Sequence, residues 1–99
     1  MLARLEAICQ QVNANGRSMG MALTSCTVPA AGKPTFQLGE NEMEMGIGIH
    51  GEPGRERRPM QPAQAIVEMM ARAIAGDLAL KRGEQVIALV NGMGGTPLI

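Results

Sequence analysis

The fold class is decided by residues 43–90, which read MEMGIGIHGEPGRERRPMQPAQAIVEMMARAIAGDLALKRGEQVIALV. The run Met43–Ile49 predicts a strand, and its two glycines lie two residues apart on one face, where another backbone or a ligand can approach closely. Apolar side chains at helical spacing then predict a helix through residues 66–74 that ends near Gly76. The continuous apolar run Val86–Val90, followed by an Asn-Gly pair, predicts a second, buried strand.

A strand, a helix of about fifteen residues and a second strand form a crossover unit. We therefore expect an α/β or α+β class, with at least two strands parallel or in one mixed sheet flanked by helices. The 99 residues are enough for a single small domain at most.

The segments before residue 43 continue this pattern. Apolar residues at helical spacing predict an amphipathic helix over residues 2–15. The apolar, glycine-interrupted run Ser18–Cys26 predicts a buried strand, and the proline- and glycine-rich residues after it predict a loop with a short extended piece at Thr35–Leu38. Residues 50–59, HGEPGRERRP, are expected to form turns and a charged loop.

The composition predicts a marginal core. A compact chain of this size has about 5,400 Å² of accessible surface, and its burial energy nearly cancels the entropy of ordering the chain. Phe36 is the only aromatic residue, so the nine methionines must fill the space that rings usually occupy. Independent stability is therefore not assured by the sequence.

Charge and cysteine content exclude several classes of protein. Nine basic and nine acidic residues balance, which argues against a nucleic-acid partner, and the lack of aromatics removes base-stacking platforms. No apolar run approaches a membrane span, and Glu6 interrupts what would be the apolar part of a secretory signal. Cys9 and Cys26 show no metal-ligand or paired spacing, so we expect reduced, partly buried thiols in a soluble, cytoplasmic protein.

His50 is the only histidine, and it follows the strand Met43–Ile49 in the segment GIHGEPG. Three chemical roles are compatible with an accessible imidazole: a metal ligand, which lacks a second ligand here, a general base, or a nucleophile toward a carbonyl group. A turn histidine bound to a backbone carbonyl is the structural alternative. Glu52 lies two residues on, where it could orient the ring or face solvent.

Two other polar segments have ordinary structural explanations. The basic cluster of Arg55, Arg57 and Arg58 could contact an anion, although local ion pairs with neighbouring acidic residues explain it better. The segment Asn91–Pro97, NGMGGTP, could present backbone N–H groups to a phosphate, but it matches neither common nucleotide-binding motif.

Residues 24–59, TSCTVPAAGKPTFQLGENEMEMGIGIHGEPGRERRP, closely resemble the substrate-binding subunit of dihydroxyacetone kinases. The segment NGMGGTPL from Asn91 resembles that family's NG-x-G-A-T-P-L segment, with Gly95 in place of the usual alanine. The similarity extends over nearly the whole chain from about Ile8 onward. It implies that the chain is part of the second α/β domain of such a subunit.

The resemblance implies a covalent role for His50, whose counterpart in the family adds to the ketone of dihydroxyacetone and holds it as a hemiaminal while a hydroxyl receives a phosphoryl group. Gly48, Gly51 and Glu52 would support the captured substrate. Short ketoses and aldoses fit this chemistry, whereas glycerol has no carbonyl. The family's phosphoryl donor, Mg-ATP or a phosphotransferase-system protein, is bound by another domain or subunit, so no cofactor or metal is expected in this chain.

The resemblance also implies that the chain is incomplete. The family's presumed acid–base pair, a second histidine and an aspartate, lies in another domain, and Asp77 is the only aspartate here. A strand and loop with no following helix at the end of the sequence point the same way. We therefore expect residues 1–99 to be one partial domain, inactive alone. The alternatives are a non-enzymatic dihydroxyacetone-sensing module or a truncated structural remnant, and a homo-oligomer is expected because it would cover an unfinished sheet edge.

Overall fold

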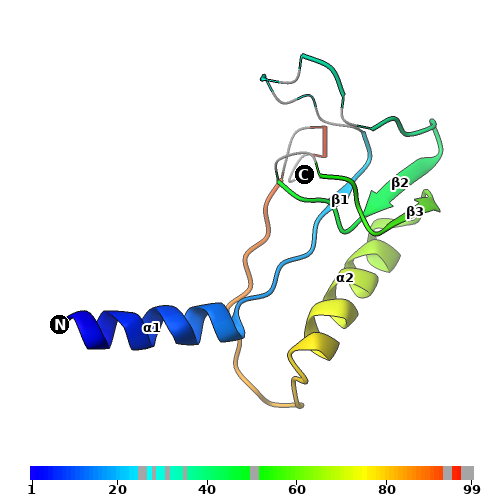
Figure 1. Ribbon diagram of the computed structural model, residues 1–99. Coiled ribbons are helices and arrows are strands. Elements are labelled where there is room, and N and C mark those ends of the chain that lie inside the picture. Colours follow the sequence, from blue (N-terminus) through cyan, green and yellow to red (C-terminus); the bar gives the residue numbers. More distant parts are fainter. Residues whose placement is uncertain are drawn as a thin grey trace.

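The computed structural model describes residues 1–24, 27, 29–30, 32–34, 36–49, 52–92 and 95–96. Within these ranges the chain forms two helices and a three-stranded sheet (Figure 1). In chain order the elements are α1 (Leu2–Asn15), β1 (Met21–Ala22), β2 (Glu42–Met45), β3 (Glu56–Pro59) and α2 (Ala63–Asp77). The expected combination of helices and strands in one small unit is therefore confirmed.

The sheet is antiparallel throughout its described part, in the order β1-β2-β3. Met21 of β1 lies opposite Met45 of β2, and on the other side of β2 Glu44 lies opposite Arg57 of β3. The strand predicted at Met43–Ile49 is thus present but ends at Met45, and the strand predicted over Ser18–Cys26 is reduced to Met21–Ala22. Ser25 and Cys26 lie outside the described residues.

The core forms between one face of β2 and helix α2. Residues alternate across a strand, so Met43 and Met45 share a face, and both pack with Ile66 of α2 in a buried cluster. Partly buried apolar side chains surround this cluster: Met19, Met21, Leu23, Met69 and Met70. Methionines therefore do fill the space that aromatic rings would occupy.

Two expectations about strands are wrong. Val86–Val90 is extended but pairs with no strand in the described structure, and its side chains are largely exposed, with Ile87 fully so. A continuous apolar run becomes a strand only where other elements cover both of its faces, and here none does. Consequently the described residues contain no parallel crossover. In the opposite direction, Glu56–Pro59 was expected to be a loop and forms the exposed edge strand β3.

Helix α1 has the predicted bounds but buries none of its residues. It projects away from the sheet and from α2 (Figure 1). Its Cys9 is exposed, so the expectation of a partly buried thiol is wrong. The thiol is exposed because no described element packs against α1.

Helix α2 begins after Pro62 and continues one residue past Gly76, near which it was predicted to end, to Asp77. The N–H of Ala79 donates to the carbonyl of Gly76 at 3.1 Å, and the N–H of Leu80 donates to that of Ala75 at 3.0 Å. This pair of bonds is the Schellman arrangement, in which the residue after the C-cap is left-handed. Ala79 occupies that position with φ of 51°, although glycine is the residue that usually does so.

The chain exposes far more surface than a compact domain of its size. Its accessible surface is 8212 Å², against about 5,400 Å² expected from its mass. Its radius of gyration is 16.1 Å, against about 12.6 Å for a compact chain of this length. The isolated helix α1 and the extended residues 84–92 account for this openness in Figure 1. No helix in the described ranges has the length and apolar character needed to cross a membrane.

Candidate functional site

The candidate site lies in the connection between the antiparallel strands β2 and β3. The structure describes Gly46–Ile49 on one side of this connection and Glu52–Arg55 on the other. His50 and Gly51, two of the predicted site residues, lie outside the described residues. The contacts described below are therefore those of the two segments that flank His50 and Gly51.

Gly48 and Glu52, the other two predicted site residues, lie against each other. The N–H of Gly48 donates to the carbonyl of Glu52 at 3.4 Å. A side chain at position 48 would collide with the Glu52 carboxylate, because a Cβ there would lie 2.6 Å from its Cδ. The absence of a side chain at Gly48 thus makes room for the carboxylate of Glu52, and the two residues close the connection just before and after residues 50 and 51.

Nearer the sheet, a backbone bond and a close packing contact fix the same connection. The N–H of Arg55 donates to the carbonyl of Met45 at 2.7 Å. Gly54 packs against β2 so closely that a Cβ on it would lie 2.7 Å from Cγ of Glu44. Any larger residue at position 54 would push the two arms of the connection apart.

Gly46 anchors the connection to the segment that leads into β1. Its N–H donates to the carbonyl of Gly20 at 2.7 Å, and a Cβ on Gly20 would lie 2.7 Å from the carbonyl oxygen of Ile47. Gly46 has φ of +79°, a conformation that favours glycine. The close approach of another backbone that the glycine spacing predicts is therefore present, at Gly46.

Below the site, a charged ladder crosses from β2 to β3. Glu44 is the one buried charged residue of the described chain, at 7% exposure. Nε of Arg57 donates to its Oε2 at 3.1 Å, and Nη1 of Arg57 lies 3.8 Å from Oε2 of Glu42. Sequence reasoning did not single out Glu44 or Glu42. The signal that could have found them is the alternation of glutamate and methionine in EMEM, which places both carboxylates on the face opposite the core.

The three arginines of the predicted basic cluster, Arg55, Arg57 and Arg58, make different contacts. Arg58 forms the predicted local ion pair, with Glu56 at 2.8 Å, whereas Arg57 pairs across the sheet with Glu44 and Glu42 of β2. The aliphatic part of Arg55 lies across Gly46, with Cγ 3.0 Å from where a Cβ would be. Arg55 also lines an open cleft of about 610 Å³ together with residues 17–20 and the end of α2.

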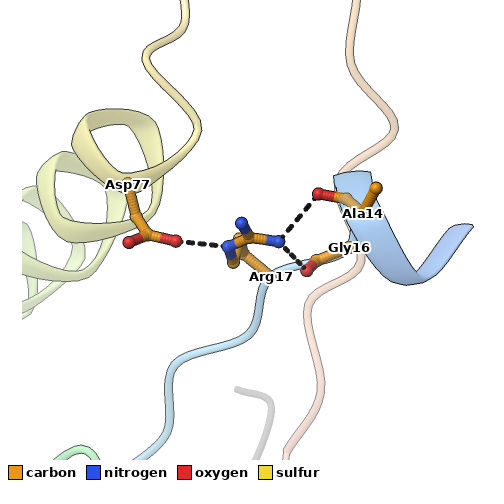
Figure 2. A network of polar contacts seen from close by, with 4 residues as sticks. All are labelled: Ala14, Gly16, Arg17 and Asp77. Atoms are coloured by element: carbon orange, nitrogen blue, oxygen red, sulfur yellow. Dashed lines mark hydrogen bonds and ion pairs between the residues drawn. The ribbon is translucent and has the colours of Figure 1, made fainter. Parts of the chain in front are cut away.

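Asp77, the only aspartate, serves the framework of the fold. It pairs with Arg17, which follows α1 (Figure 2). Nη1 of Arg17 also donates to the carbonyls of Ala14 at 3.0 Å and Gly16 at 2.8 Å. One guanidinium thus joins the end of α1 to the end of α2, and the carboxylate of Asp77 is committed to that junction.

Two described residues of the glycine-rich segment, Gly95 and Thr96, lie beside the residues that follow β1. The N–H of Leu23 donates to Oγ1 of Thr96 at 3.2 Å, and Gly95 lies against the Thr24 side chain. Met93, Gly94 and Pro97 lie outside the described residues, so a phosphate site in Asn91–Pro97 stays a prediction. Across the described positions, no three His, Cys, Asp or Glu side chains come together as metal ligands would.

Comparison with known proteins adds a family to this geometry. The Dak1 domain matches residues 1–99. The chain is 44% identical over 98 residues to the dihydroxyacetone-binding subunit of the PTS-dependent dihydroxyacetone kinase 1 of Listeria innocua, covering 99% of this chain and 30% of that protein. It is 41% identical over 113 aligned positions to the corresponding subunit of the PEP-dependent kinase of Escherichia coli K12, covering 90% of this chain and 32% of that protein.

A human relative is similarly identical to the chain and is likewise much longer. Triokinase/FMN cyclase is 40% identical over 99 aligned positions, covering 92% of this chain and 17% of that protein. The chain therefore spans less than a third of the length of each of these proteins.

Proposed function

The chain belongs to the Dak1 domain family, and on that premise we propose that it is the ketone-capturing part of a dihydroxyacetone kinase. The observation that carries this proposal is the 44% identity to a dihydroxyacetone-binding subunit over 99% of the chain, since that span includes GIHGEPG at residues 48–54. Dihydroxyacetone or a similar short ketose is the proposed substrate.

In the proposed reaction His50 is the nucleophile. A nitrogen of its neutral imidazole attacks the ketone carbon, the carbonyl electron pair moves to oxygen, and that oxygen takes up a proton as the other ring nitrogen loses one. The product is a hemiaminal. Because the attacking nitrogen belongs to an aromatic ring, it cannot lose water to give a neutral imine, so the ketone is released by simple reversal. Capture orients the substrate hydroxyl for phosphoryl transfer.

The geometry of the flanking residues supports this role. The connection that contains residue 50 is closed by the pair Gly48 and Glu52 and fixed to the sheet through Arg55 and Met45. A captured ketone held between two fixed arms has fewer orientations than one on a free loop. The carboxylate of Glu52 is close enough to the connection to act as an orienting group for the imidazole or the substrate.

The remaining parts of the kinase are proposed to lie outside these residues. The carboxylate of Asp77 is committed to its pair with Arg17, and the acid–base pair is proposed to come from elsewhere in the parent protein. The phosphoryl donor, Mg-ATP or a phosphotransferase-system protein, is bound by another domain or subunit. We further propose that residues 1–99 are one partial domain of a cytoplasmic, homo-oligomeric protein.

Native mass spectrometry tests the capture step directly. With millimolar dihydroxyacetone, the chain should gain the full mass of one ketone with no loss of water, and glycerol should give no adduct. NMR should show shifts of the His50 ring signals on addition of the ketone. His50→Asn should abolish the adduct while leaving the far-ultraviolet circular dichroism spectrum unchanged. An unmodified mass and unshifted ring signals in the folded wild-type chain would refute capture by this chain.

A kinase assay tests the division of labour. With Mg-ATP and dihydroxyacetone the chain alone should show no phosphoryl transfer, because the acid–base pair and the donor site are elsewhere. Measurable turnover that disappears in His50→Asn would contradict this part of the proposal and leave the capture step intact.

A further inference from the structure

Glu44 of β2 is a buried charged residue that the proposed capture step does not use. It lies on the face of the strand opposite the methionine core, in a row across the sheet with Ala22 of β1 and Arg57 of β3, which are directly opposite it. Its side chain is only 9% exposed, although glutamate is among the residues least often buried. The burial of this carboxylate therefore requires an explanation.

Stability alone does not explain the buried ion pair of Glu44 and Arg57. Removing a carboxylate and a guanidinium from water is so costly that apolar side chains of similar volume often stabilise a protein equally well or better. An apolar pair would lack a directed bond. Nε of Arg57 donates to Oε2 of Glu44 at 3.1 Å, and this charge-assisted bond fixes the direction of the Glu44 side chain.

The side chain held in this way lies against the connection between β2 and β3. An ideal Cβ on Gly54 would lie 2.7 Å from Cγ of Glu44, so the backbone of Gly54 packs directly on that methylene group. Gly54 is two residues from Glu52, whose carbonyl accepts the N–H of Gly48 across the connection. A displacement of Gly54 is therefore passed on to the pair that closes the connection on either side of residues 50 and 51.

We propose that Glu44 is a positioning residue for ketone capture. Held by Arg57, it fixes Gly54 and, through Gly54, the arm of the connection that follows His50. The proposal rests on the proposed function, since it concerns the same site, and it gives Glu44 no contact with the substrate. Two properties of residue 44 matter for this role: the length of its side chain and its bond to Arg57.

A double variant separates position from stability. Glu44→Met with Arg57→Met removes both charges together and leaves neither unpaired, so the urea midpoint should stay close to that of the wild-type chain. The dissociation constant for dihydroxyacetone, measured from the shifts of the His50 ring signals, should nevertheless rise at least about tenfold. As the matched control, Glu68→Met with Arg72→Met removes the exposed ion pair of α2 and should change this constant by less than about twofold.

Two conservative variants test the geometry at position 44. Glu44→Gln keeps the side-chain length and an oxygen that accepts from Arg57, so it should bind the ketone within about threefold of the wild-type chain. Glu44→Asp keeps the charge but is one methylene group shorter, so it cannot both reach Arg57 and support Gly54. It should weaken binding at least about fivefold. If the double variant does not fold, these two variants decide the question.

Amide hydrogen exchange reports on the connection without any substrate. The Gly48 amide should exchange at least about fivefold faster in the double variant and in Glu44→Asp, while the amides of α2 keep their wild-type rates. If the wild-type chain captures no ketone, the proposed function fails, and the Gly48 exchange rate alone decides the role of Glu44. Unchanged Gly48 exchange would overturn the proposal. Ketone binding at wild-type strength by the folded double variant, or binding by Glu44→Asp as tight as by Glu44→Gln, would do the same.

Discussion

Replacement of Arg57 by methionine should destabilise the sheet by leaving the buried carboxylate of Glu44 without its partner. The Glu44 side chain is 9% exposed and accepts the 3.1 Å bond from Nε of Arg57. Breaking a fully buried pair costs about 3–5 kcal/mol. Arg57 itself is 45% exposed, so water compensates part of the loss, and we expect a decrease of about 2 kcal/mol in the free energy of unfolding.

Urea unfolding followed by circular dichroism measures this decrease, and Arg72→Met is the matched control. Arg72 pairs with Glu68 on the surface of α2, where the two side chains are 78% and 54% exposed. The same substitution there should cost less than about 0.5 kcal/mol. A double-mutant cycle with Glu44→Gln should give a coupling energy of about 1 kcal/mol between Glu44 and Arg57.

The explanation fails if Arg57→Met destabilises the chain no more than Arg72→Met. It also fails if Glu44→Gln and Arg57→Met are additive in the double variant. Either outcome would mean that the ladder across β2 and β3 contributes no more than an exposed ion pair.

Three other substitutions probe the core, the site and a helix end. Met43→Ala removes the fully buried side chain at the centre of the cluster and should cost about 3 kcal/mol in urea unfolding; a cost below about 1 kcal/mol would show that the cluster is not the core. Gly48→Ala should displace Glu52 and weaken ketone capture at least about tenfold by NMR titration, whereas Gly76→Ala, which has open space around it, should leave capture unchanged; equal effects would remove the steric argument. Ala79→Gly relieves a left-handed alanine and should raise the free energy of unfolding by about 0.5–1 kcal/mol, and a decrease would show that the conformation carries no strain.

The parts of the fold that could be predicted are those in which local pattern and packing agree. Both helices were predicted because their spacing is set by the helix itself, and β2 was predicted because its residues form the core. The end of α2 was placed near Gly76 on glycine preference. The structure instead uses Ala79 for the left-handed position, which local propensity does not reveal.

The errors in the sheet share one cause, which is that strands depend on distant partners. Val86–Val90 has the more apolar sequence, yet it is exposed and pairs with none of the described strands. Glu56–Pro59 has a charged sequence, yet it pairs along its full length with β2. Its Arg57 pairs with the carboxylates of Glu42 and Glu44 on β2, a long-range charge match that neither propensity nor periodicity measures.

The structure shows how two of the predicted site residues are arranged, and the roles of all four stay predictions. Gly48 and Glu52 were named from the motif and do lie together, whereas the places of His50 and Gly51 in the site stay predictions. Glu44 was missed because a glutamate between methionines reads as a solvent-facing residue. The structure shows that its side chain is 9% exposed and pairs with Arg57.

The junction at Arg17 also determines how α1 is aimed. The helix is about 21 Å long from its 14 residues, and the bonds that orient it all converge on one guanidinium at its base (Figure 2). A rotation of the helix by about 10° about Arg17 therefore moves its far end by about 4 Å. Small differences in how Asp77 holds Arg17 are therefore enlarged along the helix, so the direction of α1 reports on this ion pair.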